Sequence, residues 1–233
     1  MKIGIIGGNG VAATNKLCEI IENKITQNGA IRDCDHPEII IWQATKAPSR
    51  SMYLEGRGPS FLEDYINIGK KLKECGCDTL CMCCNTAHFF IEELEKEIGL
   101  PFINIISEVA VKAKQTQKIK FGVMASDGCC KEHLYDKYFN ITFPKAEIIY
   151  PDSDFQKLVT KGICNVKNHN RFIDESNSES PIYCFKKVKK HLLELGAECV
   201  ILGCTDIRVA YNDNECLDSL EILADKIISL SQK

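Results

Sequence analysis

Two stretches of the chain, "GCDTLCMCC" at residues 76–84 and "GAECVILGC" at residues 196–204, follow one pattern. Each reads glycine, any residue, an acid and then a mostly apolar run that ends in cysteine eight positions after the glycine. A helix-like pattern of apolar residues precedes each of them, at residues 61–75 and 184–195. The two stretches are therefore predicted to be equivalent strands, each preceded by a helix and ending at a cysteine.

The repeat extends over most of the chain. "KIGIIGGNG" (2–10) matches "KFGVMASDG" (120–128), and "HPEIIIW" (36–42) resembles "FPKAEIIY" (143–150). Strands that alternate with helices predict parallel β-sheets covered by helices. We therefore expect an α/β fold of two similar lobes with parallel β-sheets flanked by helices, related by a pseudo-two-fold, with the active site in the cleft between them.

The expected lobe boundaries follow from the repeat. The first α/β lobe is predicted to comprise residues 1–100 plus 211–233, because the last helical pattern (220–230) is expected to pack back on the first half. The second α/β lobe is predicted to comprise residues 101–210, with 101–119 as a bridge and a polar, exposed segment at 168–181.

Composition narrows the class of partner. A formal charge of −3 and a pI near 6.0 provide no basic surplus for nucleic acid, so a small-molecule partner is expected. The apolar runs are far shorter than the roughly 20 residues that cross a bilayer, and the chain opens on a strand pattern, so no membrane association and a cytoplasmic location are expected. Most of the 14 cysteines are expected to be reduced and packed as small apolar side chains.

Cys84 and Cys204 differ from the other cysteines in their predicted position. Each follows a strand and precedes a polar residue and a helix, and catalytic residues of parallel sheets gather at such carboxyl ends. Free N–H groups at a helix N-terminus can lower a thiol pKa from about 8.5 toward neutrality. The same N–H groups, with the side chains of Asn85, Thr86 and Thr205, are candidates for holding a substrate carboxylate.

Other interpretations of this cysteine-rich segment remain open at this point. Alternation along the strand makes Cys81 and Cys83 packing residues. A zinc site would need Cys75, Cys77, Cys81 and Cys84 to converge, which a helix end and a strand interior do not favour. Cys81 and Cys84 also form a C-x-x-C pair, but Cys81 lies inside the predicted strand rather than at a helix N-terminus.

Five segments in order along the chain resemble the aspartate/glutamate racemase family, most closely its aspartate racemase branch. They are "GIIGGNG" (4–10), "APSR" (47–50), "CNTAH" (84–88), "KGICNVK" (161–167) and "LGCTD" (202–206). The resemblance implies a homodimer that interconverts L- and D-aspartate, and also glutamate, without pyridoxal phosphate or another cofactor. It implies that Cys84 and Cys204 act as acid and base on opposite faces of Cα, which two matched groups on opposite walls of one cleft can do.

The resemblance also implies binding residues. Arg50 and Lys167 are expected at the side-chain carboxylate of an acidic amino acid, and Asn85, Thr86, Ala87 and Thr205 at the α-carboxylate, where donors stabilise the charge that builds up. Asn9 and Asp206 depart from the family's usual methionine and glutamate, so Asn9 is expected near the substrate and Asp206 beside Cys204. Ser126 is a further supporting candidate, no metal is implied, and His88 is predicted to be a helix-surface or helix-packing residue rather than a catalytic one.

Two other functions are compatible with the sequence. The chain could be another enzyme of the wider superfamily, such as a maleate isomerase, a hydantoin racemase or an arylmalonate decarboxylase, although such decarboxylases need only one cysteine. A non-catalytic, thiol-rich metal or redox protein rests on the cysteine count alone. A test of racemisation on a panel of L- and D-amino acids distinguishes the first alternative from an aspartate racemase. The metal content of the purified protein tests the second alternative.

Overall fold

The computed structural model describes residues 1–231 of the 233-residue chain. The first half contains β1 (Ile3–Gly7), α1 (Val11–Gln27), η1 (Asp33–Asp35), β2 (Ile39–Gln43), α2 (Arg50–Leu54), α3 (Leu62–Glu74), β3 (Thr79–Met82), η2 (Thr86–Phe90), α4 (Ile91–Ile98), β4 (Phe102–Ile103) and α5 (Ile105–Lys114). The second half contains β5 (Lys120–Met124), α6 (Asp127–Lys131), α7 (Leu134–Thr142), β6 (Glu147–Ile149), α8 (Ser153–Val166), η3 (His169–Phe172), α9 (Pro181–Glu194), β7 (Cys199–Leu202), α10 (Ile207–Ala210), β8 (Leu217–Asp218) and α11 (Ser219–Ser231).

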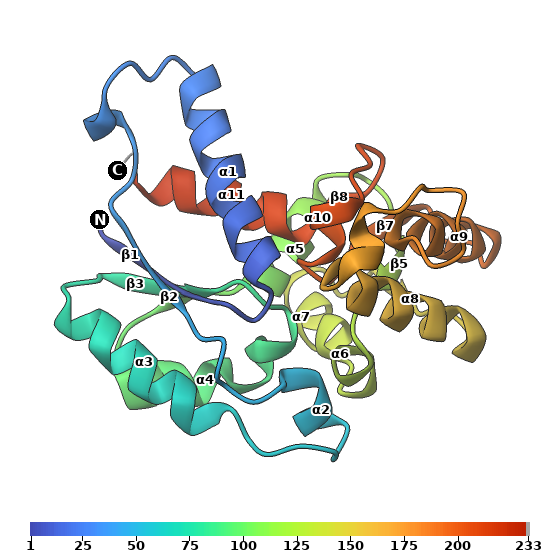
Figure 1. Cartoon of the computed structure of the whole chain (residues 1–233), viewed down its shortest axis with the longest axis horizontal. Helices are drawn as coiled ribbons and strands as arrows, with labels where there is room; N and C mark the ends of the chain where they lie inside the picture. The colour runs from blue at the N-terminus through green and yellow to red at the C-terminus, as the bar shows by residue number, and fades with distance from the viewer. Residues whose placement is uncertain (232–233) are drawn as a thin grey trace.

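Two four-stranded parallel sheets form the framework. Their strand orders are β2-β1-β3-β4 and β6-β5-β7-β8, so the same connectivity occurs twice. Figure 1 shows each sheet in its own helix-covered lobe, with the two lobes side by side. The predicted α/β class and the two equivalent lobes are thereby confirmed.

The central strands are apolar on both faces because helices cover both faces. All residues of β1, β3 and β7 are buried, and only Lys120 at the start of β5 is exposed. The edge strand β2 differs, since Ile41 and Trp42 are 40% and 39% exposed. Cys81 and Cys83 are completely buried, which confirms that they are packing residues.

The lobe boundaries differ from those predicted at two short strands. β4 at residues 102–103 pairs with β3 of the first sheet, and β8 at residues 217–218 pairs with β7 of the second sheet. A strand of two residues carries no periodicity that a sequence pattern could reveal. The following helices then cross over: α11 packs on α1 of the first lobe, as predicted, and α5 packs on α7 of the second. This exchange ties the lobes together.

Helix α2 makes a second connection between the lobes. It follows β2 in the first lobe and packs on α6 of the second, as Figure 1 shows near the bottom of the view. The backbone N–H of Gly128 in α6 donates to the Ser51 hydroxyl at 2.9 Å, and Lys131 Nζ donates to the Leu54 carbonyl at 2.8 Å. A Cβ on residue 128 would lie 2.9 Å from the Ser51 backbone, so glycine permits this close contact. Within residues 1–231, no helix is long and apolar enough to cross a membrane.

Candidate active site

A cavity of about 300 Å³ lies between the lobes and is lined by both Cys84 and Cys204. Six other predicted site residues line it: Asn9, Arg50, Thr86, Ser126, Lys167 and Asp206. The remaining lining residues are Ser49, Ser51, Met52, Glu55, Arg57, Asp127, Thr160, Ile163 and Cys164. Both lobes therefore contribute to one chamber, and each contributes one strand-end cysteine.

The two cysteines occupy equivalent places in the repeat. Cys84 lies two residues after the end of β3 and Cys204 two residues after the end of β7, and both strands are internal to their sheets. Both thiols are only partly exposed, as expected for groups that must meet a substrate away from bulk water. The cavity and the topology thus bring together two residues 120 positions apart (204 − 84).

The electrostatic setting of Cys204 differs from the sequence-based expectation. Burial raises the pKa of the Cys204 thiol, the neighbouring Asp206 carboxylate raises it further, and Lys167 acts in the opposite direction. The predicted lowering by a helix N-terminus does not dominate, because the helix that follows, α10, has only four residues and a correspondingly small dipole. Cys204 therefore holds its proton in the unliganded protein.

Asp206 and Lys167 form an ion pair beside Cys204. Lys167 Nζ lies 3.0 Å from Asp206 Oδ2, and the Asp206 side chain is 3% exposed whereas that of Lys167 is 49% exposed. Burial raises the pKa of Asp206, and Lys167 opposes that shift. The Asp206 side chain also reaches across the cleft and lies against Gly10 of the first lobe. Any side chain larger than hydrogen at residue 10 would collide with the Asp206 carboxylate. The predicted place of Asp206 beside Cys204 agrees with this geometry.

Arg50 occupies the corresponding position beside Cys84. Its guanidinium donates to the carbonyls of Asn9 at 3.1 Å and Pro48 at 3.0 Å, and its buried Nε has no hydrogen-bond partner within residues 1–231. Burial acts to lower the pKa of Arg50, but the proximity of Cys84 and Tyr65 raises it. The Arg50 guanidinium therefore lies close to the Cys84 thiol and to the Tyr65 hydroxyl.

Asn9 and the pair Thr86 and Ser126 complete the polar wall. Asn9 Nδ2 donates to the Tyr65 hydroxyl at 2.7 Å, and its buried Oδ1 has no hydrogen-bond partner in the described part of the chain. The hydroxyls of Thr86 and Ser126 are 2.7 Å apart and come from opposite lobes. Hydroxyls can both donate and accept, so this pair can turn a donor toward an anion in the cavity.

Three predicted substrate ligands do not line the cavity. Asn85 is 2% exposed, and its amide accepts from the Tyr135 hydroxyl at 2.9 Å and donates to Ser219 Oγ at 3.1 Å. Thr205 Oγ1 donates to the Cys83 carbonyl at 3.1 Å, and Ala87 is completely buried. The side chains of Asn85 and Thr205 thus connect the lobes instead of forming the cavity wall. A contribution from the backbone N–H groups after each cysteine stays a prediction.

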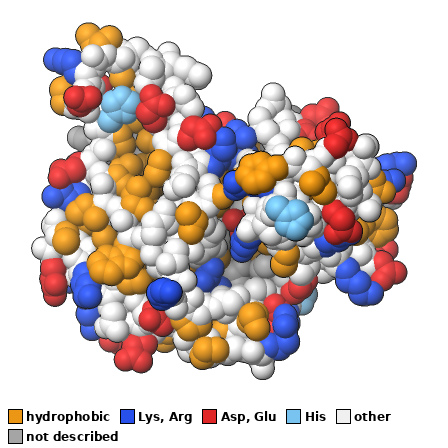
Figure 2. Space-filling view, viewed as in Figure 1, with side chains coloured by type: hydrophobic (Ala, Val, Ile, Leu, Met, Phe, Trp, Pro, Cys, Tyr) orange, Lys and Arg blue, Asp and Glu red, His pale blue; other side chains and the backbone are white. Residues whose placement is uncertain are grey.

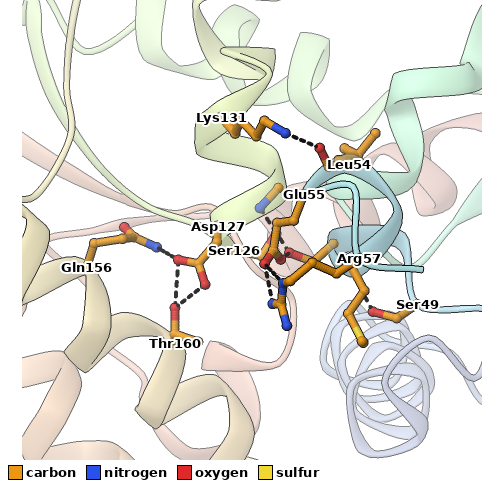
Figure 3. Close-up of polar contacts among 12 residues, drawn as sticks. Ser49, Leu54, Glu55, Arg57, Ser126, Asp127, Lys131, Gln156 and Thr160 are labelled. Atoms are coloured by element: carbon orange, nitrogen blue, oxygen red, sulfur yellow. Dashed lines mark hydrogen bonds and ion pairs between the residues drawn. The ribbon is translucent and has the colours of Figure 1, made fainter.

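Asp127 is among the residues that the sequence reasoning missed. It lies at the position of the second half that matches Asn9 in the repeat, and this alignment was the signal that could have identified it. Its carboxylate accepts from Thr160 Oγ1 at 2.8 Å and from Gln156 Nε2 at 2.8 Å (Figure 3). In the same view, Arg57 is paired with Glu55 on the α2 side of the cavity. Neither Arg57 nor Glu55 belongs to a recognisable sequence motif.

His88 has a structural role, as predicted. It is completely buried, and its Nδ1 lies 2.9 Å from the Cys84 carbonyl while its Nε2 accepts from the Ile105 N–H at 3.1 Å. Since Nε2 accepts this bond, Nδ1 carries the proton and donates to Cys84. Burial lowers the pKa of His88 to about 4. The neutral ring therefore holds the loop that carries Cys84.

No group of three or more His, Cys, Asp or Glu side chains in residues 1–231 is arranged to hold a metal ion. Cys81 is a fully buried thiol whose pKa is raised by burial, so it lacks the thiolate character of a redox cysteine. The chemistry that the cavity itself offers is proton transfer by two opposed thiols next to fixed cations and hydroxyls.

The chain matches the Asp/Glu/Hydantoin racemase family over residues 3–226, and it belongs to that family. A curated relative, the broad specificity amino-acid racemase RacX of Bacillus subtilis (strain 168), is 23% identical over 232 residues, which are 97% of this chain and 96% of the relative. The fold resembles that of an aspartate racemase from Picrophilus torridus, with a TM-score of 0.80, 23% identity and coverage of 100% and 94% of the two chains. It also resembles glutamate racemase RacE1 from Bacillus anthracis, with a TM-score of 0.63, 18% identity and coverage of 99% and 80%.

The contacts of Asn85 lead to a prediction about stability. Replacement of Tyr135 by Phe removes the hydroxyl that donates to the buried Asn85 Oδ1 and leaves this acceptor unsatisfied. We expect the free energy of unfolding to fall by about 1–3 kcal/mol, measured by urea denaturation. The matched control is Tyr183→Phe on α9, because Tyr183 is half-buried and its hydroxyl makes no hydrogen bond within residues 1–231. Equal stability of the two variants would contradict the bridging role of Asn85.

His88 leads to a prediction about pH. Its folded-state pKa of about 4 is below the ordinary value of 6.5, so the unfolded chain binds the additional proton between these values. The neutral ring's contribution to stability is complete above pH 6.5 and is lost as the pH falls toward 4. Between pH 7 and pH 5 this loss amounts to about 2 kcal/mol.

The pH effect is isolated by comparison with His88→Gln, which has no titrating ring. Other groups change in the same range, notably Asp218, whose pKa is raised to about 6 by burial and which acts in the opposite direction. The difference between wild type and variant cancels their contribution. Denaturant midpoints measured at both pH values should show a steeper acid-side loss for the wild type, and parallel losses would argue against a buried neutral His88.

Proposed function

We propose that this protein is a cofactor-independent amino-acid racemase that interconverts L- and D-aspartate, with glutamate as a second candidate substrate. The observation that carries the proposal is the pair of thiols from equivalent strand ends of opposite lobes, which line a single cavity. The aspartate and glutamate racemases among the structural neighbours and the amino-acid racemase among the relatives support it.

The proposed chemistry is two-base proton transfer at Cα. In one direction Cys84 acts as thiolate and removes the α-proton, and the Cys204 thiol donates a proton to the opposite face. The S–H bond formed at Cys84 is balanced by the S–H bond broken at Cys204, so the thiol and the thiolate exchange places. The raised pKa of Cys204 supports its role as the proton donor in this direction.

The developing negative charge moves onto the α-carboxylate, which needs hydrogen-bond donors. Thr86 and Ser126 line the cavity and can supply donors, each worth about 3 kcal/mol in a preorganised site. Arg50 and Lys167, which both line the cavity, are proposed to bind the side-chain carboxylate. This arrangement assigns the acidic amino acid's two carboxylates to two different pairs of residues, each with one member from either lobe.

The location and the assembly belong to the same proposal. Both thiols must stay reduced, and reducing conditions prevail in the cytoplasm, so we propose that the enzyme acts there. We also propose a homodimer that forms through the free edge of β2, where Ile41 and Trp42 are exposed and the outer side of the strand has no partner strand within residues 1–231.

The mechanism predicts that Cys84→Ala and Cys204→Ala each abolish racemisation, because inversion needs both an acid and a base. Each variant should retain exchange of the α-proton with solvent deuterium for a single enantiomer, measured by NMR on L- and D-aspartate. Cys164→Ala is the matched control, since Cys164 lines the same cavity but lies within α8 rather than at a strand end. Full racemisation by either strand-end variant would exclude the two-base mechanism.

The assembly proposal predicts a dimer in solution. Light scattering during gel filtration should give twice the chain mass of 26.2 kDa for the wild type. Trp42→Glu places a charge at the proposed contact and should shift the mass to that of one chain, whereas Ile31→Glu changes an exposed apolar residue outside β2 and should leave the dimer intact. A dimeric Trp42→Glu variant would place the contact elsewhere.

A further inference from the structure

A second, larger chamber of about 730 Å³ adjoins the thiol cavity. Five residues line both spaces and form the partition between them: Asn9, Ser49, Arg50, Lys167 and Asp206. On the outer side, the chamber is lined by the start of α1 in the first lobe and by Arg171 and Phe172 of η3 in the second. The outer chamber therefore meets the thiol cavity where Arg50 and Lys167 lie.

The arginines of the chain divide into two groups. Three of the five are ion-paired with a carboxylate: Arg32 with Asp35, Arg57 with Glu55, and Arg208 with Asp218. Arg50 and Arg171 form no ion pair within residues 1–231, and both line the outer chamber. Unpaired guanidinium groups that converge on one cavity provide a site for a carboxylate.

Neighbouring acids do not neutralise Arg171. Asp206, the acid that lines the outer chamber, is already paired with Lys167 at 3.0 Å. Glu19 lies along the adjoining groove that Arg171 also lines, and it is paired with Lys16 at 2.7 Å. Figure 2 shows Lys and Arg side chains in the hollow between the two lobes. The chamber consequently retains an excess of positive charge.

Phe172 holds the Arg171 side chain in place. The guanidinium carbon lies 4.5 Å from the centre of the Phe172 ring, a cation–π contact. The ring is 77% exposed, which is unusual for a large apolar side chain. The contact between Phe172 and Arg171 explains why this ring is exposed. The ring restricts the motion of the Arg171 guanidinium before a ligand binds.

We propose that Arg171 is a specificity-determining residue that binds the anionic side chain of an incoming acidic amino acid in the outer chamber, before Arg50 and Lys167 receive it. The proposal rests on the racemase function proposed above and deepens it by naming the residue that first binds the dicarboxylic substrate. Arg171 lines the outer chamber and not the thiol cavity, so its contribution falls on substrate capture rather than on proton transfer.

The test compares Arg171→Gln with the wild type in two measurements. In steady-state racemisation of aspartate and glutamate, the variant should lose about tenfold in kcat/KM through KM, with kcat within about twofold. The dependence of kcat/KM on salt should also weaken, because a charge that attracts the substrate has been removed. In calorimetry, succinate, a dicarboxylate that cannot racemise, should bind about tenfold more weakly to the variant.

Three further variants sharpen the result. Arg171→Lys should recover part of the loss because it restores the charge without the planar fork, and Phe172→Ala should show a smaller loss than Arg171→Gln. Arg32→Gln is the matched control, since Arg32 is an exposed arginine paired with Asp35 that lines neither chamber. It should behave as wild type in both measurements.

The outcomes separate the two proposals. If the wild type racemises acidic amino acids but Arg171→Gln keeps the wild-type KM, salt dependence and succinate affinity, the role of Arg171 is overturned and the racemase function stands. If the wild type binds succinate in an Arg171-dependent way but racemises no amino acid, the anion site stands and the racemase function fails.

Discussion

The hydrogen bond from the Thr205 hydroxyl to the Cys83 carbonyl joins the loop that carries one strand-end cysteine to the loop that carries the other. Asn85 makes the complementary connection, because it is held by Tyr135 and Ser219 of the second half. Two-base chemistry needs its acid and base at a fixed separation, and these buried contacts lie directly beside both thiols. The separation of the thiols is therefore set by contacts next to them and not by the distant lobe surfaces.

The exchange of α5 and α11 reinforces the same constraint over a larger distance. Each helix follows the last short strand of one half and packs against the other lobe. Helix α2 adds a third connection through Ser51 and Gly128 at the side of the cavity. The cavity is thus enclosed by segments that cross from one lobe to the other, and Arg50 lies on one of them.

Much of this arrangement could be predicted from the sequence because the chain repeats itself. The repeat identified the two strand-end cysteines and the two-lobed α/β class, and the resemblance added Arg50 and Lys167, which line the cavity. The roles of Asn85 and Thr205 could not be inferred, since a polar residue after a cysteine can face a substrate or the other lobe. Asp127 could have been identified from its alignment with Asn9 in the repeat, but its contacts with Gln156 and Thr160 of α8 could not, because that helix is distant in sequence.

The residues that flank the two thiols break the symmetry of the fold. At the second position after the cysteine, the first half has Thr86 and the second half has the carboxylate of Asp206, paired with Lys167. Cys84 lies beside the guanidinium of Arg50, whereas Cys204 lies beside an ion pair whose acid raises the thiol pKa. The backbone around the two thiols is thus repeated, whereas the charges beside them are not. Asp206 and burial raise the pKa of Cys204, and the group beside Cys84 is instead a guanidinium.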